Sequence, residues 1–177
     1  MLTIDALKST LLVVDFQSRL MPAIDQGEAA VANARRLIDA AAMLEVPTLF
    51  TEQNARGLGP TVPELAPDPS LLAHKMTFDA VREPSFLGRL AEEHAIVVAG
   101  CEAHVCVLQT VLGLLDAGRA VYVVRDALGA RRAESKETAL RRMERHGAEI
   151  VTTEMVVFEW LGTAEHPRFR DAIALIK

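Results

Sequence analysis

The fold is decided by residues 95–124, which read AIVVAGCEAHVCVLQTVLGLLDAGRAVYVV. The stretch begins with an apolar run of strand length that is closed by Gly100, and it ends with a second such run at residues 120–124. Residues 102–117 between the two runs are predicted to form a helix, or a turn that leads into one, and Gly118 is typical of the position just after a helix end. The segment therefore predicts a strand, a helix and a second strand that is parallel to the first.

The same alternation of strand and helix continues through the rest of the chain. Apolar runs predict strands at residues 10–14, 46–51, 71–75 and 149–151. Helices are expected at residues 28–44, 84–93 and 134–146 with two short ones in the tail, and the Gly- and Pro-rich residues 56–69 are expected to form a loop. Strands this rich in Val, Ile and Leu are typical of burial on both faces. We therefore predict one α/β domain, residues 1–177, in which helices cover both faces of a mainly parallel sheet.

Composition limits the classes of function. Half of the 177 residues are hydrophobic, which is enough to build a continuous core. The formal net charge of −5 argues against nucleic acid or an anionic membrane as the main partner, because both bind basic surfaces. The longest apolar runs have the length of strands, and the first residues lack the pattern of a signal peptide. With two cysteines and no disulfide framework, we expect a cytoplasmic protein with reduced thiols.

Reactive side chains follow several of the predicted strands. Asp15 follows the first strand, Lys75 ends the third, and Cys106 comes shortly after the fourth. Because ligands of an open parallel sheet bind beyond the carboxyl ends of its strands, a carboxylate, an amine and a thiol are expected at one edge. Near the start of a helix, the thiol pKa of Cys106 is expected to be lowered by the helix dipole and by a nearby lysine. Taken singly, Asp15 is equally compatible with a cap or turn residue, whereas Lys75 is more typical of an ordinary exposed lysine and Cys106 of a small buried hydrophobic residue.

Other kinds of site find little support in the sequence. Cys101 and Cys106 are five residues apart, which differs from the C-x-x-C spacing of zinc and thioredoxin-like sites. The five histidines do not have the spacing of metal ligands. Neither of the glycine-rich phosphate-binding motifs, G-x-x-x-x-G-K and G-x-G-x-x-G, is present. We therefore expect no metal and no cofactor. A thiol redox protein that uses Cys101 and Cys106 stays open as an alternative.

The chain contains an ordered set of motifs, namely residues 11–17 (LLVVDFQ), Lys75 and residues 100–110 (GCEAHVCVLQT). This set resembles the isochorismatase-like cysteine hydrolases, and the resemblance covers essentially the whole chain. Residues 51–53 (TEQ), 57–65 (GLGPTVPEL), 151–154 (VTTE) and 166–169 (HPRF) are similar to the isochorismatase-domain-containing subgroup.

This resemblance implies a doubly wound, three-layer fold with six strands, a homo-oligomer, and a catalytic triad of Asp15, Lys75 and Cys106. It also implies a cis peptide bond between Cys101 and Glu102, with an oxyanion hole formed by the backbone N–H groups of Glu102 and Cys106. Two positions depart from common family patterns. Ala103 stands where many members have Thr, and residues 52–54 (EQN) lack the His of metal-dependent nicotinamidases.

The function expected from this resemblance is hydrolysis of an amide-type C–N bond in a small molecule through a thioester intermediate. Asp15 would be the general base, and Lys75 would stabilise the thiolate of Cys106. Phe16, Gln53, Phe78 and His104 follow the triad elements in sequence and are predicted to line the substrate pocket. The rival interpretations are a non-catalytic binding or scaffold protein on the same fold and the thiol redox protein.

Overall fold

The computed structural model describes residues 2–177, which contain a six-stranded sheet in which every neighbouring pair of strands is parallel. The strands lie in the order β3-β2-β1-β4-β5-β6. Their bounds are β1 Ser9–Val14, β2 Thr48–Gln53, β3 Leu72–Lys75, β4 Ala95–Cys101, β5 Val121–Gly129 and β6 Glu149–Val151. The predicted doubly wound α/β fold is therefore confirmed.

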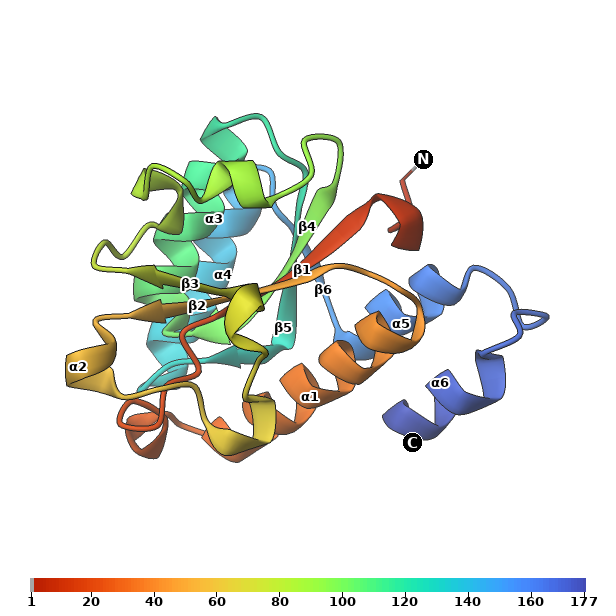
Figure 1. Ribbon diagram of the computed structural model, residues 1–177, viewed down its shortest axis with the longest axis horizontal. Helices are drawn as coiled ribbons and strands as arrows, with labels where there is room; N and C mark the ends of the chain where they lie inside the picture. Colours follow the sequence, from red (N-terminus) through yellow and green to blue (C-terminus); the bar gives the residue numbers. More distant parts are fainter. Residues whose placement is uncertain (1) are drawn as a thin grey trace.

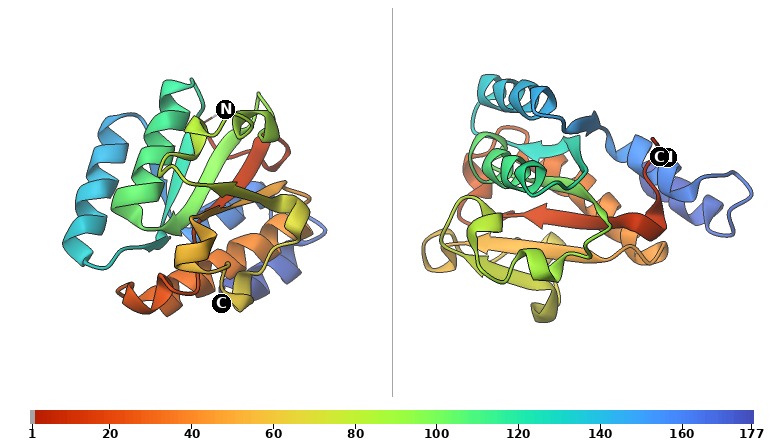
Figure 2. Two further views of the ribbon diagram at one scale, coloured as in Figure 1. Left: turned by 60° about the vertical axis from the view of Figure 1, so that its left-hand side comes forward. Right: turned by 90° about the horizontal axis from the view of Figure 1, so that it is seen from above.

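Helices cover both faces of the sheet (Figure 1). One face carries α1 (Gly27–Met43), α5 (Thr153–Leu161) and α6 (Phe169–Ile176), and the other carries α3 (Leu108–Asp116) and α4 (Ala133–Arg145). Figure 2 shows the sheet between these two helical layers. A short helix, α2 (Ala55–Leu58), follows β2.

Strand β1 shows why the sheet needs both layers. Side chains of a strand alternate between its two faces. Leu11 and Val13 pack with α1 in one hydrophobic cluster, whereas Leu12 and Val14 pack with α3 in a second one. All six residues of β1 are buried, so both faces of this central strand are shielded from solvent.

Two predicted segments differ from the structure. The predicted helix at residues 84–93 is wrong, because only a single 3₁₀ turn forms at Leu87–Arg89. Phe86 and Leu90 have helical spacing and are both buried, but Gly88 between them weakens helix formation. The Arg89 guanidinium instead donates hydrogen bonds to backbone oxygens before and within β3. The predicted loop at residues 56–69 is also interrupted, by α2 and by a short 3₁₀ turn at Pro63–Leu65.

The order of the strands fixes where a site can form. The chain builds outward from β1 to β2 and β3 on one side, then crosses to β4 and continues to β5 and β6 on the other side. The carboxyl ends of β1 and β4 therefore border the point where the direction of winding reverses, which is the usual ligand crevice of open α/β sheets. Asp15 directly follows β1, and Cys101 ends β4 at this crevice.

Within residues 2–177, no helix has the length and apolar character that crossing a bilayer requires.

Candidate active site

Asp15 is the first residue after the central strand β1. Its backbone has a φ of 50°, a left-handed conformation that Asp adopts more readily than most residues. Its N–H donates to the Thr51 carbonyl oxygen of β2 at 3.1 Å, and its own carbonyl oxygen accepts from the Gln17 N–H at 2.8 Å. The Asp15 side chain is fully buried. The turn therefore holds a carboxylate inside the protein at the carboxyl end of the sheet.

Lys75, the last residue of β3, forms a buried ion pair with this carboxylate. Its Nζ lies 2.6 Å from Asp15 Oδ2, and its side chain is 1% exposed. The ammonium also donates to the carbonyl oxygens of Thr77 at 3.2 Å and Phe78 at 3.3 Å. Removing two charges from water is costly, and close pairing with further hydrogen bonds offsets that cost. The ordinary interpretation of Lys75 as an exposed lysine is therefore wrong.

Thr51 is a polar residue of the site that the sequence did not single out. Its hydroxyl donates to Asp15 Oδ1 at 2.6 Å, so both carboxylate oxygens of Asp15 have a donor. Thr51 pairs in register with Val14 of β1, one residue before Asp15. A polar residue beside the end of the central strand was the available signal, but a buried Thr is also ordinary in a strand.

Cys106 lies in a five-residue π-helical turn, Ala103–Val107, that leads from β4 into α3. Such turns occur frequently at functional sites. Burial raises the pKa of the Cys106 thiol to about 12; the Asp15 carboxylate raises it and the Lys75 ammonium lowers it. The expected lowering of this pKa is wrong for the free protein, because desolvation outweighs the cation. Both charged groups nevertheless lie close enough to act electrostatically on the thiol, so the three residues form one cluster.

Glu102 precedes this turn and is joined to Cys101 by a cis peptide bond, as the resemblance implied. Its buried side chain forms an ion pair with Arg131, whose Nε lies 2.8 Å from Glu102 Oε2. The Arg131 backbone N–H also lies 3.4 Å from the same oxygen. The Glu102 side chain is thus held by both the side chain and the backbone of Arg131.

Cys101 and Cys106 lie on different faces of the sheet. Cys101 packs in the cluster on the α1 side, whereas Cys106 packs in the cluster on the α3 side. Both thiols are free, and burial raises the pKa of Cys101 strongly. This arrangement does not favour the interpretation of the two thiols as a redox pair.

A family model described as the isochorismatase domain matches residues 9–155, a range that includes all three residues of this cluster. The chain belongs to the isochorismatase family. A curated relative, isochorismatase domain-containing protein 2 of Xenopus laevis, is 37% identical over 171 residues, which are 95% of this chain and 83% of the relative. The resemblance seen in the motifs is therefore confirmed, including the subgroup.

Several solved structures share the fold of this chain over nearly its whole length. A structure described as MAR1 ribonuclease from Caenorhabditis elegans has a TM-score of 0.91 and 35% identity, and the match covers 98% of this chain and 92% of that one. The YcaC gene product of Escherichia coli, described as an octameric hydrolase of unknown specificity, has a TM-score of 0.86 and 26% identity over 99% and 88% of the two chains. YcaC from Pseudomonas aeruginosa, described with hexane-2,5-diol and covalent acrylamide, has a TM-score of 0.83 and 26% identity over 99% and 97%.

The four predicted substrate-pocket residues of this isochorismatase-family protein do not gather in one place. Phe16 is part of the core on the α1 side and is 1% exposed, so its side chain is not available to a ligand. Gln53 donates to the Met76 carbonyl oxygen at 3.1 Å, in the loop that follows Lys75. Phe78 is in the same loop and is 49% exposed. His104 lines a cavity of about 450 Å³ together with residues of α4.

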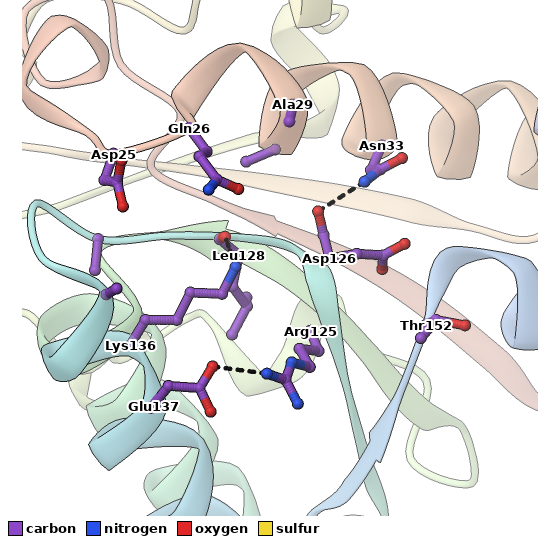
Figure 3. Close-up of a pocket in the computed structure, with 13 residues that line it drawn as sticks. Asp25, Gln26, Ala29, Asn33, Arg125, Asp126, Leu128, Lys136, Glu137 and Thr152 are labelled. Carbon is purple, nitrogen blue, oxygen red and sulfur yellow. Dashed lines mark hydrogen bonds and ion pairs between the residues drawn. The ribbon is translucent and has the colours of Figure 1, made fainter.

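A separate polar cavity of about 460 Å³ lies between the start of α1, the end of β5 and the start of α4 (Figure 3). Its charged side chains include Arg125, paired with Glu137 at 2.8 Å, and Lys136, which donates to the Leu128 carbonyl oxygen at 2.7 Å. Neither Asp15 nor Cys106 lines it. The cluster of Asp15, Lys75 and Cys106 in this isochorismatase-family protein is therefore distinct from this cavity.

Proposed function

We propose that this isochorismatase-family protein is a cysteine hydrolase that cleaves an amide-type C–N bond of a small molecule. Cys106 is the nucleophile, Asp15 the general base and Lys75 the residue that stabilises the thiolate. The observation that carries the proposal is the buried Asp15–Lys75 ion pair, whose two charges act in opposite directions on the adjacent thiol. A buried, strongly perturbed group beside a specific charge partner is a typical feature of catalytic sites.

The reaction begins with a neutral thiol, because the raised pKa keeps Cys106 protonated at neutral pH. As the sulfur attacks the carbonyl carbon, its proton passes to Asp15, and Lys75 stabilises the sulfur anion. The C–S bond forms, and the negative charge on the carbonyl oxygen is held by the N–H groups of Glu102 and Cys106. Asp15 then gives the proton to the leaving amine as the C–N bond breaks.

A water molecule completes the cycle. Asp15 takes a proton from the water, whose oxygen attacks the thioester carbon. The C–S bond breaks, the proton returns to the sulfur, and a carboxylic acid leaves. The net change is amide plus water to acid plus amine, and the resting thiol and ion pair are restored.

Two descriptions among the relatives bear on this proposal. A bound covalent acrylamide, described for YcaC of Pseudomonas aeruginosa, supports a reactive group in this fold. The octameric YcaC of Escherichia coli supports a homo-oligomer for this chain. We further propose that it works in the cytoplasm, because two free thiols suit a reducing compartment.

Ribonuclease activity is the second candidate, since the Caenorhabditis elegans neighbour is described as a ribonuclease. The net charge of −5 argues against it, because RNA binding depends strongly on basic contacts to phosphates.

The test compares the wild type with Cys106→Ala and with Cys101→Ala as a matched buried-thiol control. Release of ammonia from a panel of small primary amides is measured beside cleavage of a labelled single-stranded RNA. The proposal expects turnover of at least one amide by the wild type and Cys101→Ala, with loss in Cys106→Ala. RNA cleavage that survives Cys106→Ala, without amide turnover, would replace the proposal with the second candidate.

A further inference from the structure

The position of the Lys75 ammonium depends on the loop that follows β3. An ammonium has three N–H donors. In Lys75 one is directed to Asp15, and the other two are directed to the backbone oxygens of Thr77 and Phe78. Two of the three contacts that place this cation therefore come from the backbone of residues 77–78, and a shift of this loop would move the cation.

Thr110 of α3 holds this loop at two points. Its hydroxyl accepts from the Ala80 N–H at 3.0 Å and donates to the Phe78 carbonyl oxygen at 3.3 Å. The Thr110 side chain is fully buried, so no water can replace these contacts without a structural change. The Phe78 oxygen thus accepts from both Thr110 and Lys75.

Thr110 also has a fixed relation to the nucleophile. It follows Cys106 by four residues on the continuous helical path of the π turn and α3, and residues four apart lie on the same helix face. The loop packs tightly on this face, since a Cβ built on Gly113 of α3 would lie 2.7 Å from Asp79 Oδ1. One hydroxyl therefore connects the helix that carries the thiol with the carbonyl group that holds the cation.

We propose that Thr110 is a positioning residue, which sets the distance between the Lys75 ammonium and the Cys106 sulfur by anchoring the Phe78 carbonyl group. The inference rests on the proposed role of Lys75 beside the thiol and adds a residue that does not itself touch the reacting atoms. A purely structural Thr110 would affect stability alone, whereas a positioning residue also affects how readily Cys106 loses its proton.

The experiment measures alkylation of Cys106 by iodoacetamide, with peptide mapping, in the wild type, Thr110→Val, Thr110→Ser and Lys75→Met. Rates are compared at fixed pH between 7 and 9.5, where the rate rises tenfold per pH unit, so a ratio of rates reports a shift in thiol acidity. Thr110→Val keeps the shape and removes the hydroxyl. In Thr110→Val we expect alkylation of Cys106 to slow about 3- to 10-fold, which equals a rise of about 0.5–1 unit in the thiol pKa. Thr110→Ser should react like the wild type, and Lys75→Met should slow more than Thr110→Val.

Thr153→Val is the matched control, because Thr153 is another buried threonine whose hydroxyl donates elsewhere, to Asp126. It should lose stability without slowing alkylation.

If Lys75→Met slows the reaction and Thr110→Val does not, the positioning role is overturned while the proposed function stands. If Thr110→Ser slows as much as Thr110→Val, packing rather than the hydroxyl is responsible, and the inference is again overturned. If Lys75→Met has no effect, the proposed role of Lys75 fails, and the inference fails with it. Should Thr110→Val not fold, Thr110→Ala against Thr110→Ser gives the same comparison.

Discussion

Replacing Lys75 by Met would leave the Asp15 carboxylate buried without its cation. Both side chains are essentially inaccessible, and the pair is separated by 2.6 Å. Removal of one partner from a buried ion pair costs about 3–5 kcal/mol, since the remaining charge keeps its desolvation cost. For a domain of this size, about 2–4 °C in Tm corresponds to each kcal/mol, so a fall of about 6–20 °C is expected.

The assay is urea unfolding with linear extrapolation, carried out on Lys75→Met, on Asp15→Asn with Lys75→Met, and on the wild type. The double variant contains neither charge and keeps a similar shape, so it should be more stable than Lys75→Met alone by about 1–3 kcal/mol. Lys136→Met is a matched control. Lys136 is half-buried and donates to a carbonyl oxygen rather than to a carboxylate. Its replacement should cost about 1.5 kcal/mol or less.

A free energy of unfolding of Lys75→Met within about 1 kcal/mol of the wild type would contradict this expectation, and so would a further loss of stability on adding Asp15→Asn. Either result would mean that the Lys75 ammonium does not stabilise the buried Asp15 carboxylate.

Thr51→Val removes a donor to the Asp15 carboxylate and should cost about 1.5–3 kcal/mol in urea unfolding, whereas Thr51→Ser should stay close to the wild type. Gly100→Ala places a Cβ 2.6 Å from the Val14 Cβ and should destabilise by about 1–3 kcal/mol, whereas Gly88→Ala, with open space around it, should be nearly neutral; equal effects would contradict this account. The thiol pKa of Cys106 is raised from 9.0 to about 12 on folding, because burial favours the protonated thiol. The stability that this thiol contributes is therefore fully present below pH 9 and is lost as the pH rises toward 12. Unfolding between pH 8 and 11 should therefore show a shallower loss of stability in Cys106→Ala than in the wild type, and parallel curves would argue against the buried neutral thiol.

Much of the fold could be predicted because the central strands have little freedom. Residues 11–14 and 95–99 are apolar throughout, which is typical of burial on both faces, and the structure confirms this for the two strands. The segment at residues 84–93 could not be predicted in the same way. Its two buried side chains, Phe86 and Leu90, satisfy a helical spacing that a single turn also provides.

The site was only partly accessible from the sequence. Asp15 and Lys75 could be placed at one edge of the sheet because each ends or follows a strand, but their pairing depends on the neighbouring positions of β1, β2 and β3. Thr51 and Thr110 lie within the quoted motifs, but the sequence does not assign them to the site, since a buried threonine in a strand or helix is ordinary until its hydroxyl partner is known. The thiol pKa of Cys106 was expected to fall because the helix start was visible in the sequence, whereas the depth of burial was not.

The central claim is that Cys106 attacks a carbonyl carbon and carries the acyl group. The measurement that tests it most directly is the location of the acetyl group after brief reaction with p-nitrophenyl acetate, acid quenching and peptide mass analysis. The account predicts one acetyl group on Cys106 as a hydroxylamine-sensitive thioester, formed equally in Cys101→Ala and much more slowly in Asp15→Asn. Acetylation that spares Cys106, or that proceeds at the same rate in Asp15→Asn, would contradict it.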